Sequence, residues 1–229
     1  MRVLSFVLYC LMQRILSATH GLAPKHLAKL LLICALAVAA NFLAIQIRAL
    51  HEVPLFIDTI FTVAVALALG VFPGIAVAVL TWVATGIQIG YFYPFVFVAI
   101  AEVLLVCWLK PISPKTQDWI RHNTHEGKTA RLVIVSAQLL VLYIVCAIVA
   151  SVLGGVIAYF YYTVLGRDVY TFWTAVNAFR RNFLQGGSPV FLADVFSRVQ
   201  INIVDRFVAI FGGYFVSLAI VNFLKEGKQ

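Results

Sequence analysis

Long apolar runs constrain this chain more than any motif does. A helix needs about 20 consecutive apolar residues to cross roughly 30 Å of hydrocarbon, and Leu27–Arg48 is one such run. With 63% hydrophobic and 11% charged residues, the chain has more apolar surface than a soluble core of this size can bury. The sequence therefore predicts an integral membrane protein.

The apolar runs favour membrane-spanning helices over a membrane β-barrel. Barrel strands are short segments of alternating hydrophobicity, whereas these runs are long and continuous. We therefore expect an all-α polytopic membrane protein, with one membrane domain over residues 1–229 and a six-helix transmembrane bundle over residues 27–224. The six predicted spans are Leu27–Arg48, Val53–Gly70, Phe72–Gly90, Phe92–Leu109, Arg131–Gly154 and Ile201–Leu224.

An amphipathic helix at the membrane interface is expected in residues 1–26, because Gln13 and Arg14 interrupt an otherwise apolar segment. A signal peptide is the alternative, since Arg2 precedes an apolar stretch, but no clear small-residue cleavage pattern follows.

Two features are expected between the fifth and sixth spans. The pair Gly154-Gly155 predicts a break or bend in a run that is longer than a bilayer needs. A short separate helix is expected over Val190–Gln200, leading into the last span.

The positive charges predict the orientation in a cytoplasmic membrane. Lys and Arg are in excess in cytoplasmic segments, and a cytoplasmic amino terminus places most of the 17 basic residues on the inner side. Both termini are then cytoplasmic. Nucleic acid is not an expected partner despite the formal net charge of +8, because the basic residues form no aromatic-interleaved patch. The basic residues left on the outer side are Arg48, Arg167, Arg180, Arg181 and Arg198.

Polar side chains inside the predicted spans fall on common helix faces in the outer half of the bundle. Asp58 and Thr62, for example, are one helical turn apart. Such groups are expensive in lipid and are functional candidates by default, so a pocket open to the outside is one interpretation. The alternative is structural, with interhelical hydrogen bonds and with Asp205 or Asp58 paired to Arg48 or Arg206. The other polar groups are Asn41 with Arg48, Thr81 with Thr85 and Gln88, Asn202 with Asp205 and Arg206, and the isolated Glu102, whose role stays open.

Small residues on the first span indicate a close helix contact. Ala35 and Ala39 are four residues apart and lie about 150° around the helix from Asn41 and Arg48. Such spacing lets another helix approach closely. The other helix belongs either to a separate subunit or to the same bundle.

No motif supports an enzyme, a metal site or a cofactor. Gly127-Lys128-Thr129 lacks the earlier glycine and the preceding strand of a phosphate-binding loop. The four cysteines lie singly in apolar runs without ligand spacing. We interpret the cluster Asp118, His122, His125 and Glu126 as a solvated loop.

Four of the spans resemble the substrate-binding S-components of energy-coupling-factor transporters. Phe56-Ile57-Asp58-Thr59-Ile60-Phe61-Thr62, then Leu67-Ala68-Leu69-Gly70 and Phe72-Pro73-Gly74, are similar to that family's second and third spans. Val204-Asp205-Arg206-Phe207 resembles the Asp-Lys start of its last helix, with arginine in place of lysine. The spacing of Ala35 and Ala39 resembles the motif by which S-components dock onto a coupling subunit.

The resemblance implies a six-helix subunit that captures a small nutrient, often a vitamin, from outside the cell. Uptake would then need a membrane coupling subunit and separate ATPase subunits as partners, with Ala35 and Ala39 at the docking face. A sensory or accessory membrane subunit that works by binding other proteins is the alternative, because similar hairpins occur in sensing regions of bacterial histidine kinases. The expected substrate-binding residues are Asn41, Arg48, Asp58, Trp82, Thr85, Gln88, Asn177, Arg181 and Asp205.

Overall fold

The computed structural model describes residues 24–51, 59–90, 94–109, 127–166 and 174–225, and all regular structure in these ranges is helical. The all-α fold is therefore confirmed. Most of the predicted interfacial helix, residues 1–23, lies outside the described residues. Among the described residues, four helices have the length and composition of membrane-spanning segments: α2 (Pro24–His51), α4 (Val71–Ile89), α7 (Gly127–Tyr159) and α9 (Val190–Lys225).

The other helices are shorter. Helices α3 (Ile60–Leu69) and α5 (Val96–Trp108) have 10 and 13 residues and occupy the second and fourth predicted spans. At 1.5 Å per residue they are about 15 and 20 Å long, less than a bilayer crossing. Residues 52–58, which begin the second predicted span, lie outside the described residues. Helix α8 (Thr174–Gln185) is polar on one side and precedes α9.

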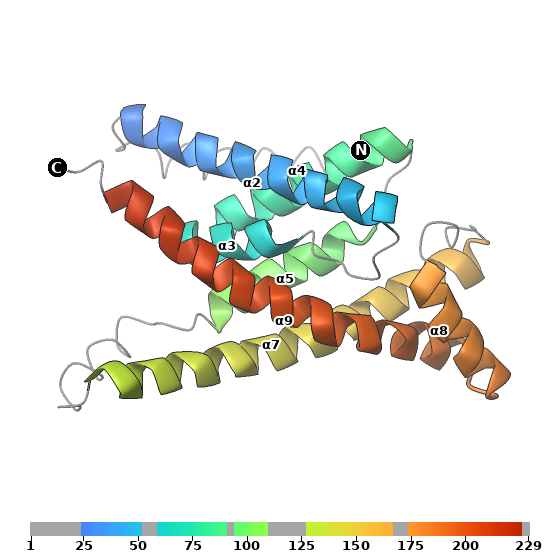
Figure 1. Ribbon diagram of the computed structural model, residues 1–229. Helices are drawn as coiled ribbons and strands as arrows, with labels where there is room; N and C mark the ends of the chain where they lie inside the picture. Colours follow the sequence, from blue (N-terminus) through green and yellow to red (C-terminus); the bar gives the residue numbers. More distant parts are fainter. Residues whose placement is uncertain (1–23, 52–58, 91–93, 110–126, 167–173, 226–229) are drawn as a thin grey trace.

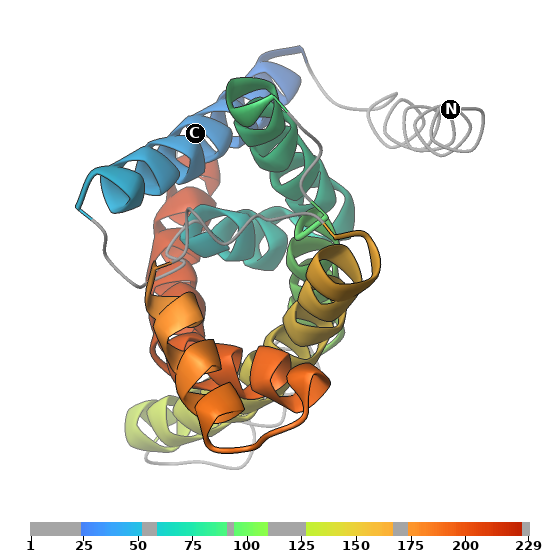
Figure 2. The same cartoon turned by 90° about the vertical axis from the view of Figure 1, so that its right-hand side faces the viewer.

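Helix α3 lies at the centre of the bundle. Its residues from Thr62 to Leu67 are all buried, so no side of this stretch faces lipid or water. Helices α9, α4, α2 and α5 pack around it, and Figure 2, viewed from the end that carries α8, shows α3 enclosed by the longer helices. A helix that is apolar on every side is typical of such a position.

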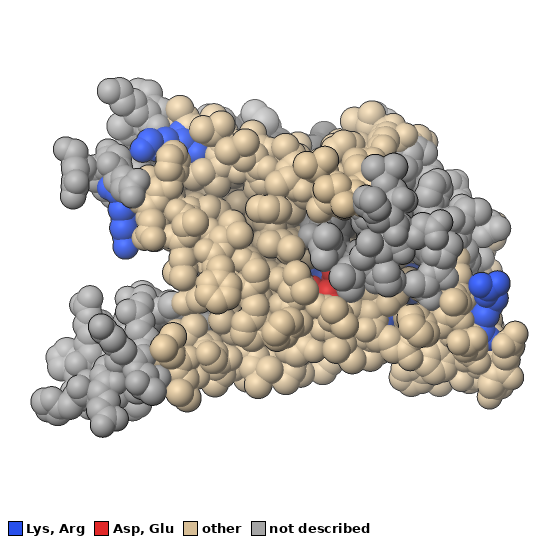
Figure 3. Space-filling view, in the orientation of Figure 1, with Lys and Arg blue, Asp and Glu red and all other residues tan. Residues whose placement is uncertain are grey.

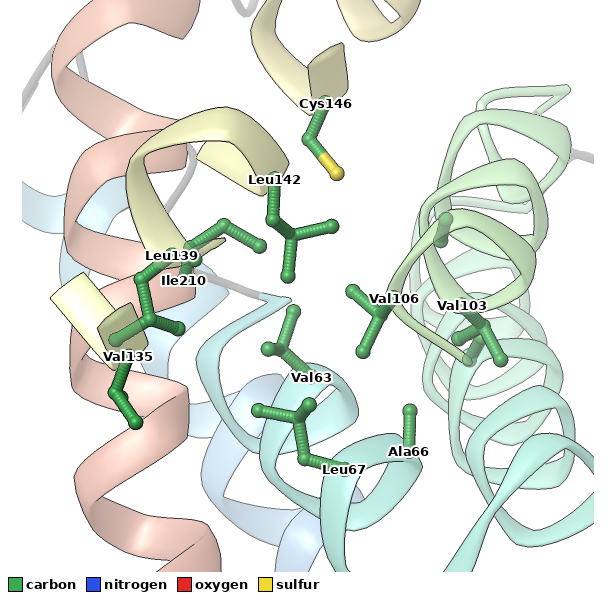
Figure 4. Close-up of a cluster of buried hydrophobic side chains, with 12 residues drawn as sticks. Val63, Ala66, Leu67, Val103, Val106, Val135, Leu139, Leu142, Cys146 and Ile210 are labelled. Atoms are coloured by element: carbon green, nitrogen blue, oxygen red, sulfur yellow. The ribbon is translucent and has the colours of Figure 1, made fainter. Parts of the chain in front are cut away.

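The largest cluster of buried apolar side chains joins α3 to α5, α7 and α9. Val63 and Leu67 of α3 meet Val103 of α5, Leu142 of α7 and Ile210 of α9 in this cluster (Figure 4). A smaller cluster packs α2 against α3 and α4.

The structure shows no break at Gly154-Gly155, and the expected separate helix over Val190–Gln200 is wrong. Helix α7 continues through the two glycines and ends in a turn of π-helix at Phe160–Val164, and α9 is one helix of 36 residues. The glycines provide close packing instead. A Cβ atom on Gly155 would lie 2.7 Å from the Cα atom of Val195, so only glycine lets α9 approach α7 here.

The long sides of the bundle are apolar. Large hydrophobic side chains are exposed on all four long helices, including Leu31, Leu80, Ile148 and Phe215. Figure 3 shows most of the Lys and Arg atoms of this face at the two ends of the molecule, with an almost uncharged surface between them. This distribution fits a multi-pass membrane protein, because lipid tails solvate apolar side chains and the ends meet water.

The helices alternate in direction. The start of α2, the start of α7 and the end of α9 lie at one end of the bundle, and α8 lies at the other (Figure 1). Pro24 and Lys225, the first and last described residues, therefore lie at the same end of the bundle. An even number of spans that alternate in direction has this property.

We expect Gly213→Ala to lower the free energy of unfolding by about 1–3 kcal/mol, because it overpacks the contact between α9 and α3. The added Cβ atom would lie 2.7 Å from Cγ1 of Val63 and 3.0 Å from the carbonyl oxygen of Ile60. Denaturant unfolding of the purified protein in detergent measures the change.

Gly212→Ala is the matched control, because the nearest atom there is Cγ2 of Ile60 at 3.6 Å. Alanine favours a helix by about 1 kcal/mol over glycine, so this variant should be neutral or more stable. Equal destabilisation by both substitutions would contradict the packing of α3 on α9.

Candidate functional site

A stripe of buried polar side chains runs along α9. Asp194, Arg198, Asn202 and Arg206 are spaced four residues apart, and Asp205 lies beside the last of them. All five are buried. The stripe covers about 18 Å of the helix, and each step of four residues turns it about 40° around the axis. Its members therefore contact different neighbouring helices. The stripe has a charged group at each end and the uncharged Asn202 in the middle.

One charged end is a cluster around the guanidinium of Arg206. Its Nε and Nη2 atoms donate hydrogen bonds to Oδ2 of Asp205, at 3.1 and 2.6 Å. Nη1 donates to Oε2 of Glu102 on α5 and, at 3.1 Å, to Oγ1 of Thr59, which precedes the first residue of α3. Arg206 therefore links α9, α5 and the N-terminal end of α3.

The members of this cluster are shielded from both water and lipid. The exposed fractions are 0% for Asp205, 2% for Glu102 and 4% for Arg206. Taking charges out of water is expensive, and removing one partner of such a pair typically destabilises a protein by about 3–5 kcal/mol. Glu102, whose role the sequence left open, is thus an ion-pair partner. The sequence alternative that paired Asp205 with Arg206 is confirmed.

The middle of the stripe is uncharged. Nδ2 of Asn202 donates a hydrogen bond to Oγ of Ser151 at 3.0 Å, and this hydroxyl donates to the carbonyl oxygen of Ala147 at 2.7 Å. The first bond joins α9 to α7, and the second lies within α7.

The other charged end lies where α8 meets α9. Nε of Arg180 on α8 donates to Oδ1 of Asp194 at 2.8 Å. Arg198, one turn after Asp194, donates from Nη1 to the main-chain carbonyl oxygen of Asp194 at 2.9 Å. Its guanidinium lies 5.5 Å from the centre of the Phe95 ring, which is a cation–π distance.

Several sequence-predicted site residues make contacts within the bundle. Asn41 is fully buried, donates to Oγ1 of Thr62 at 2.8 Å and accepts from the main-chain N–H of Phe61 at 3.3 Å. Oγ1 of Thr85 donates to the carbonyl oxygen of Thr81 in its own helix. Asn41 thus joins α2 to α3, whereas the hydrogen bond of Thr85 stays within α4.

The remaining candidates are spread over the molecule. Gln88 is exposed and bonds to Gln46 of α2 at 2.7 Å, and Trp82 packs against the main apolar cluster. Asn177 and Arg181 lie on α8, where Arg181 is exposed. Asp58 lies outside the described residues. Arg48 belongs to the last turns of α2.

Ala35 and Ala39 are exposed on α2, on the face opposite the buried Asn41. Among the residues that the structure describes, no helix of the same bundle covers these two alanines. Their role as a docking face stays a prediction.

Sequence reasoning did not select six residues of the stripe and its contacts as site residues: Glu102, Arg180, Asp194, Arg198, Asn202 and Arg206. The separate helix expected over Val190–Gln200 hid the spacing of four that runs from Asp194 to Arg206. That spacing was the available signal, because polar residues every four positions in an apolar context share a helix face. No group of three or more metal-ligating side chains occurs among the residues that the structure describes.

Comparison with known proteins found no matching family model, no matching curated protein and no matching solved structure.

Arg206→Met is expected to lower the free energy of unfolding by about 3–5 kcal/mol, because it leaves Glu102 and Asp205 buried without the guanidinium that contacts both. Arg181→Met is the matched control: it removes the same group from an exposed position and should change stability by about 0.5 kcal/mol or less. Denaturant unfolding in detergent compares the two variants. Equal effects would rule out a stabilising role for the buried cluster.

Proposed function

We propose that the chain is a membrane-embedded subunit that captures a small polar solute from outside the cell and passes it inward with the help of separate subunits. The observation that supports this most is the buried polar stripe of α9. Ionisable side chains inside a membrane domain are rare and mark substrate or ion sites by default. Here three acids and three arginines, on α5, α8 and α9, are buried or half-buried.

The proposed topology has six crossings and cytoplasmic termini. Helices α3 and α5 would then form the second and fourth crossings together with flanking residues. The shared end of Pro24 and Lys225 supports an even number of crossings. In this orientation the end that carries α8 faces outward, and the stripe leads from there towards the middle of the bundle. Arg206 lies sixteen residues after the start of α9 and nineteen before its end.

The proposed partners are a membrane coupling subunit and ATPase subunits, as for the S-components that the sequence resembles. The exposed Ala35 and Ala39 support this division of labour, because a small-residue face on a lipid-facing helix lets another helix pack closely. In this proposal the polar side of α2, with Asn41, faces the bundle while the alanine side meets the coupling subunit.

A second candidate function is an accessory or sensory membrane subunit that binds other proteins and no small solute. The observation that favours it is the mutual pairing of polar groups. Asn41 bonds to Thr62, Asn202 to Ser151, and Arg206 to Glu102 and Asp205. Side chains that satisfy one another can hold helices together without a ligand.

Ala39→Leu is expected to abolish the association with the coupling and ATPase subunits while leaving the unfolding midpoint unchanged, because the added atoms point away from the buried side of α2. Ala219→Leu on the exposed side of α9 is the matched control. The measurement is purification of each variant from its native cells, followed by mass spectrometry of bound subunits and of small molecules.

The proposal requires wild type and Ala219→Leu to retain the subunits and a small polar solute, and Ala39→Leu to retain the solute alone. Retention of all subunits by Ala39→Leu would refute the docking face. Co-purified membrane proteins without any solute would favour the accessory function.

A further inference from the structure

Arg198 differs from the other buried arginine of α9 in what surrounds it. It is 6% exposed, and its Nη1 atom donates to a carbonyl oxygen of its own helix, that of Asp194. The ring of Phe95 lies beneath the guanidinium. On the α7 side, a Cβ atom on Gly154 would lie 3.0 Å from Cδ and 3.3 Å from Nε of Arg198. The glycine therefore makes room for this side chain.

No carboxylate of the described residues pairs with Arg198. The carboxylate of the nearby Asp194 pairs with Arg180 instead, at 2.8 Å. Arg206, by contrast, contacts two carboxylates. A guanidinium has five N–H donors. Among the described residues, the guanidinium of Arg198 donates a hydrogen bond from Nη1 alone. Arg198 is thus a buried cation compensated by a ring face and a main-chain carbonyl.

A buried charge without a counter-charge lowers the stability of the fold. We therefore expect the Arg198 guanidinium to be kept because it binds something. The planar guanidinium fits the two oxygen atoms of a carboxylate or phosphate group, with two parallel hydrogen bonds. The surroundings favour an anion as well. Phe95 is the residue that precedes the first turn of α5, so Arg198 lies near the positive end of that helix dipole.

We propose that Arg198 binds an oxyanion, the carboxylate or phosphate group of a ligand, at the α8 end of the bundle. The inference rests on the proposed capture function in one respect: it names the chemical class of the captured solute as anionic. The same chemistry would accept the phosphate of a lipid headgroup, and the experiment separates these two sources.

The first measurement compares the stability of variants without added anions. Arg198→Met keeps the length of the side chain and removes the uncompensated charge, so its thermal unfolding midpoint in neutral detergent should equal or exceed that of wild type. Arg206→Met, which breaks a satisfied cluster, should lower the midpoint. A drop for Arg198→Met as large as that for Arg206→Met, or a failure to fold, would overturn the proposal.

The second measurement tests binding in nanodiscs of phosphatidylcholine, with sodium phosphate and sodium acetate as probes and sodium chloride at equal ionic strength as the reference. Binding to the folded state raises the unfolding midpoint. The midpoint should rise for wild type but not for Arg198→Met. Lys29→Met is the matched control and should respond like wild type, because Lys29 lies 4.9 Å over the Phe223 ring at the opposite end of the bundle.

Arg198→Lys keeps the charge but loses the planar fork, so its apparent affinity for phosphate should fall about tenfold. A midpoint that rises with phosphatidylglycerol in the nanodisc, but not with phosphate or acetate, would identify a lipid headgroup as the source of the oxyanion. Responses that are equal in wild type and Arg198→Met, or absent for every probe, would overturn the site.

These results are independent of transport. Anion binding at Arg198 in a protein that co-purifies with no coupling subunit would refute the proposed capture function and leave the site intact. Co-purified ATPase subunits and a neutral solute, with no response to anions, would refute the Arg198 site and leave the capture function intact.

Discussion

The contact on which the bundle depends most is that between Arg206 and its three oxygen-bearing partners. Its guanidinium joins α9 to Glu102 of α5 and to Thr59 at the start of α3, while Asp205 supplies the second carboxylate. Helix α3 is short and buried on every side, so its position is set by its neighbours and not by the bilayer. The ionic cluster fixes the N-terminal end of α3, and the Gly213 contact with Val63 fixes its packing against α9.

The two buried arginines of α9 have different roles: Arg206 holds the structure together, and Arg198 carries the proposed binding function. Arg206 is surrounded by acids, and its removal would leave them without a counter-charge. Arg198, two helical turns nearer the α8 end, has an aromatic ring and a carbonyl oxygen where Arg206 has carboxylates. A protein that uses one stripe to hold its helices together and to meet a ligand would need both kinds of site. Asn202, which bonds to Ser151, lies between the two charged ends.

Much of the fold follows from the sequence, and particular residues show where prediction stops. Apolar runs predicted an all-helical membrane protein, and the spacing between Asn41 and Ala39 placed them on opposite faces of the first span, as the structure has them. The glycine pair at 154 and 155 misled, because glycine serves equally for bending and for close packing. The position of Val195 against Gly155 shows the close packing, which no sequence pattern reveals.

The pairing of Glu102 with Arg206 was out of reach for a different reason. The two residues are 104 positions apart, and no periodicity within one helix reports which helix lies opposite. The i, i+4 series from Asp194 to Arg206 was readable in principle, because it needs only a continuous helix.

The coupling free energy between Glu102 and Arg206 tests the account most directly. It is obtained from denaturant unfolding of wild type, Glu102→Gln, Arg206→Gln and the double variant in detergent. Residues in one ion-pair network couple by about 0.5–3 kcal/mol, and the buried contact predicts a stabilising coupling in the upper half of that range. A coupling near zero, with each substitution tolerated alone, would contradict the claim that this ion pair holds α5 and α9 together.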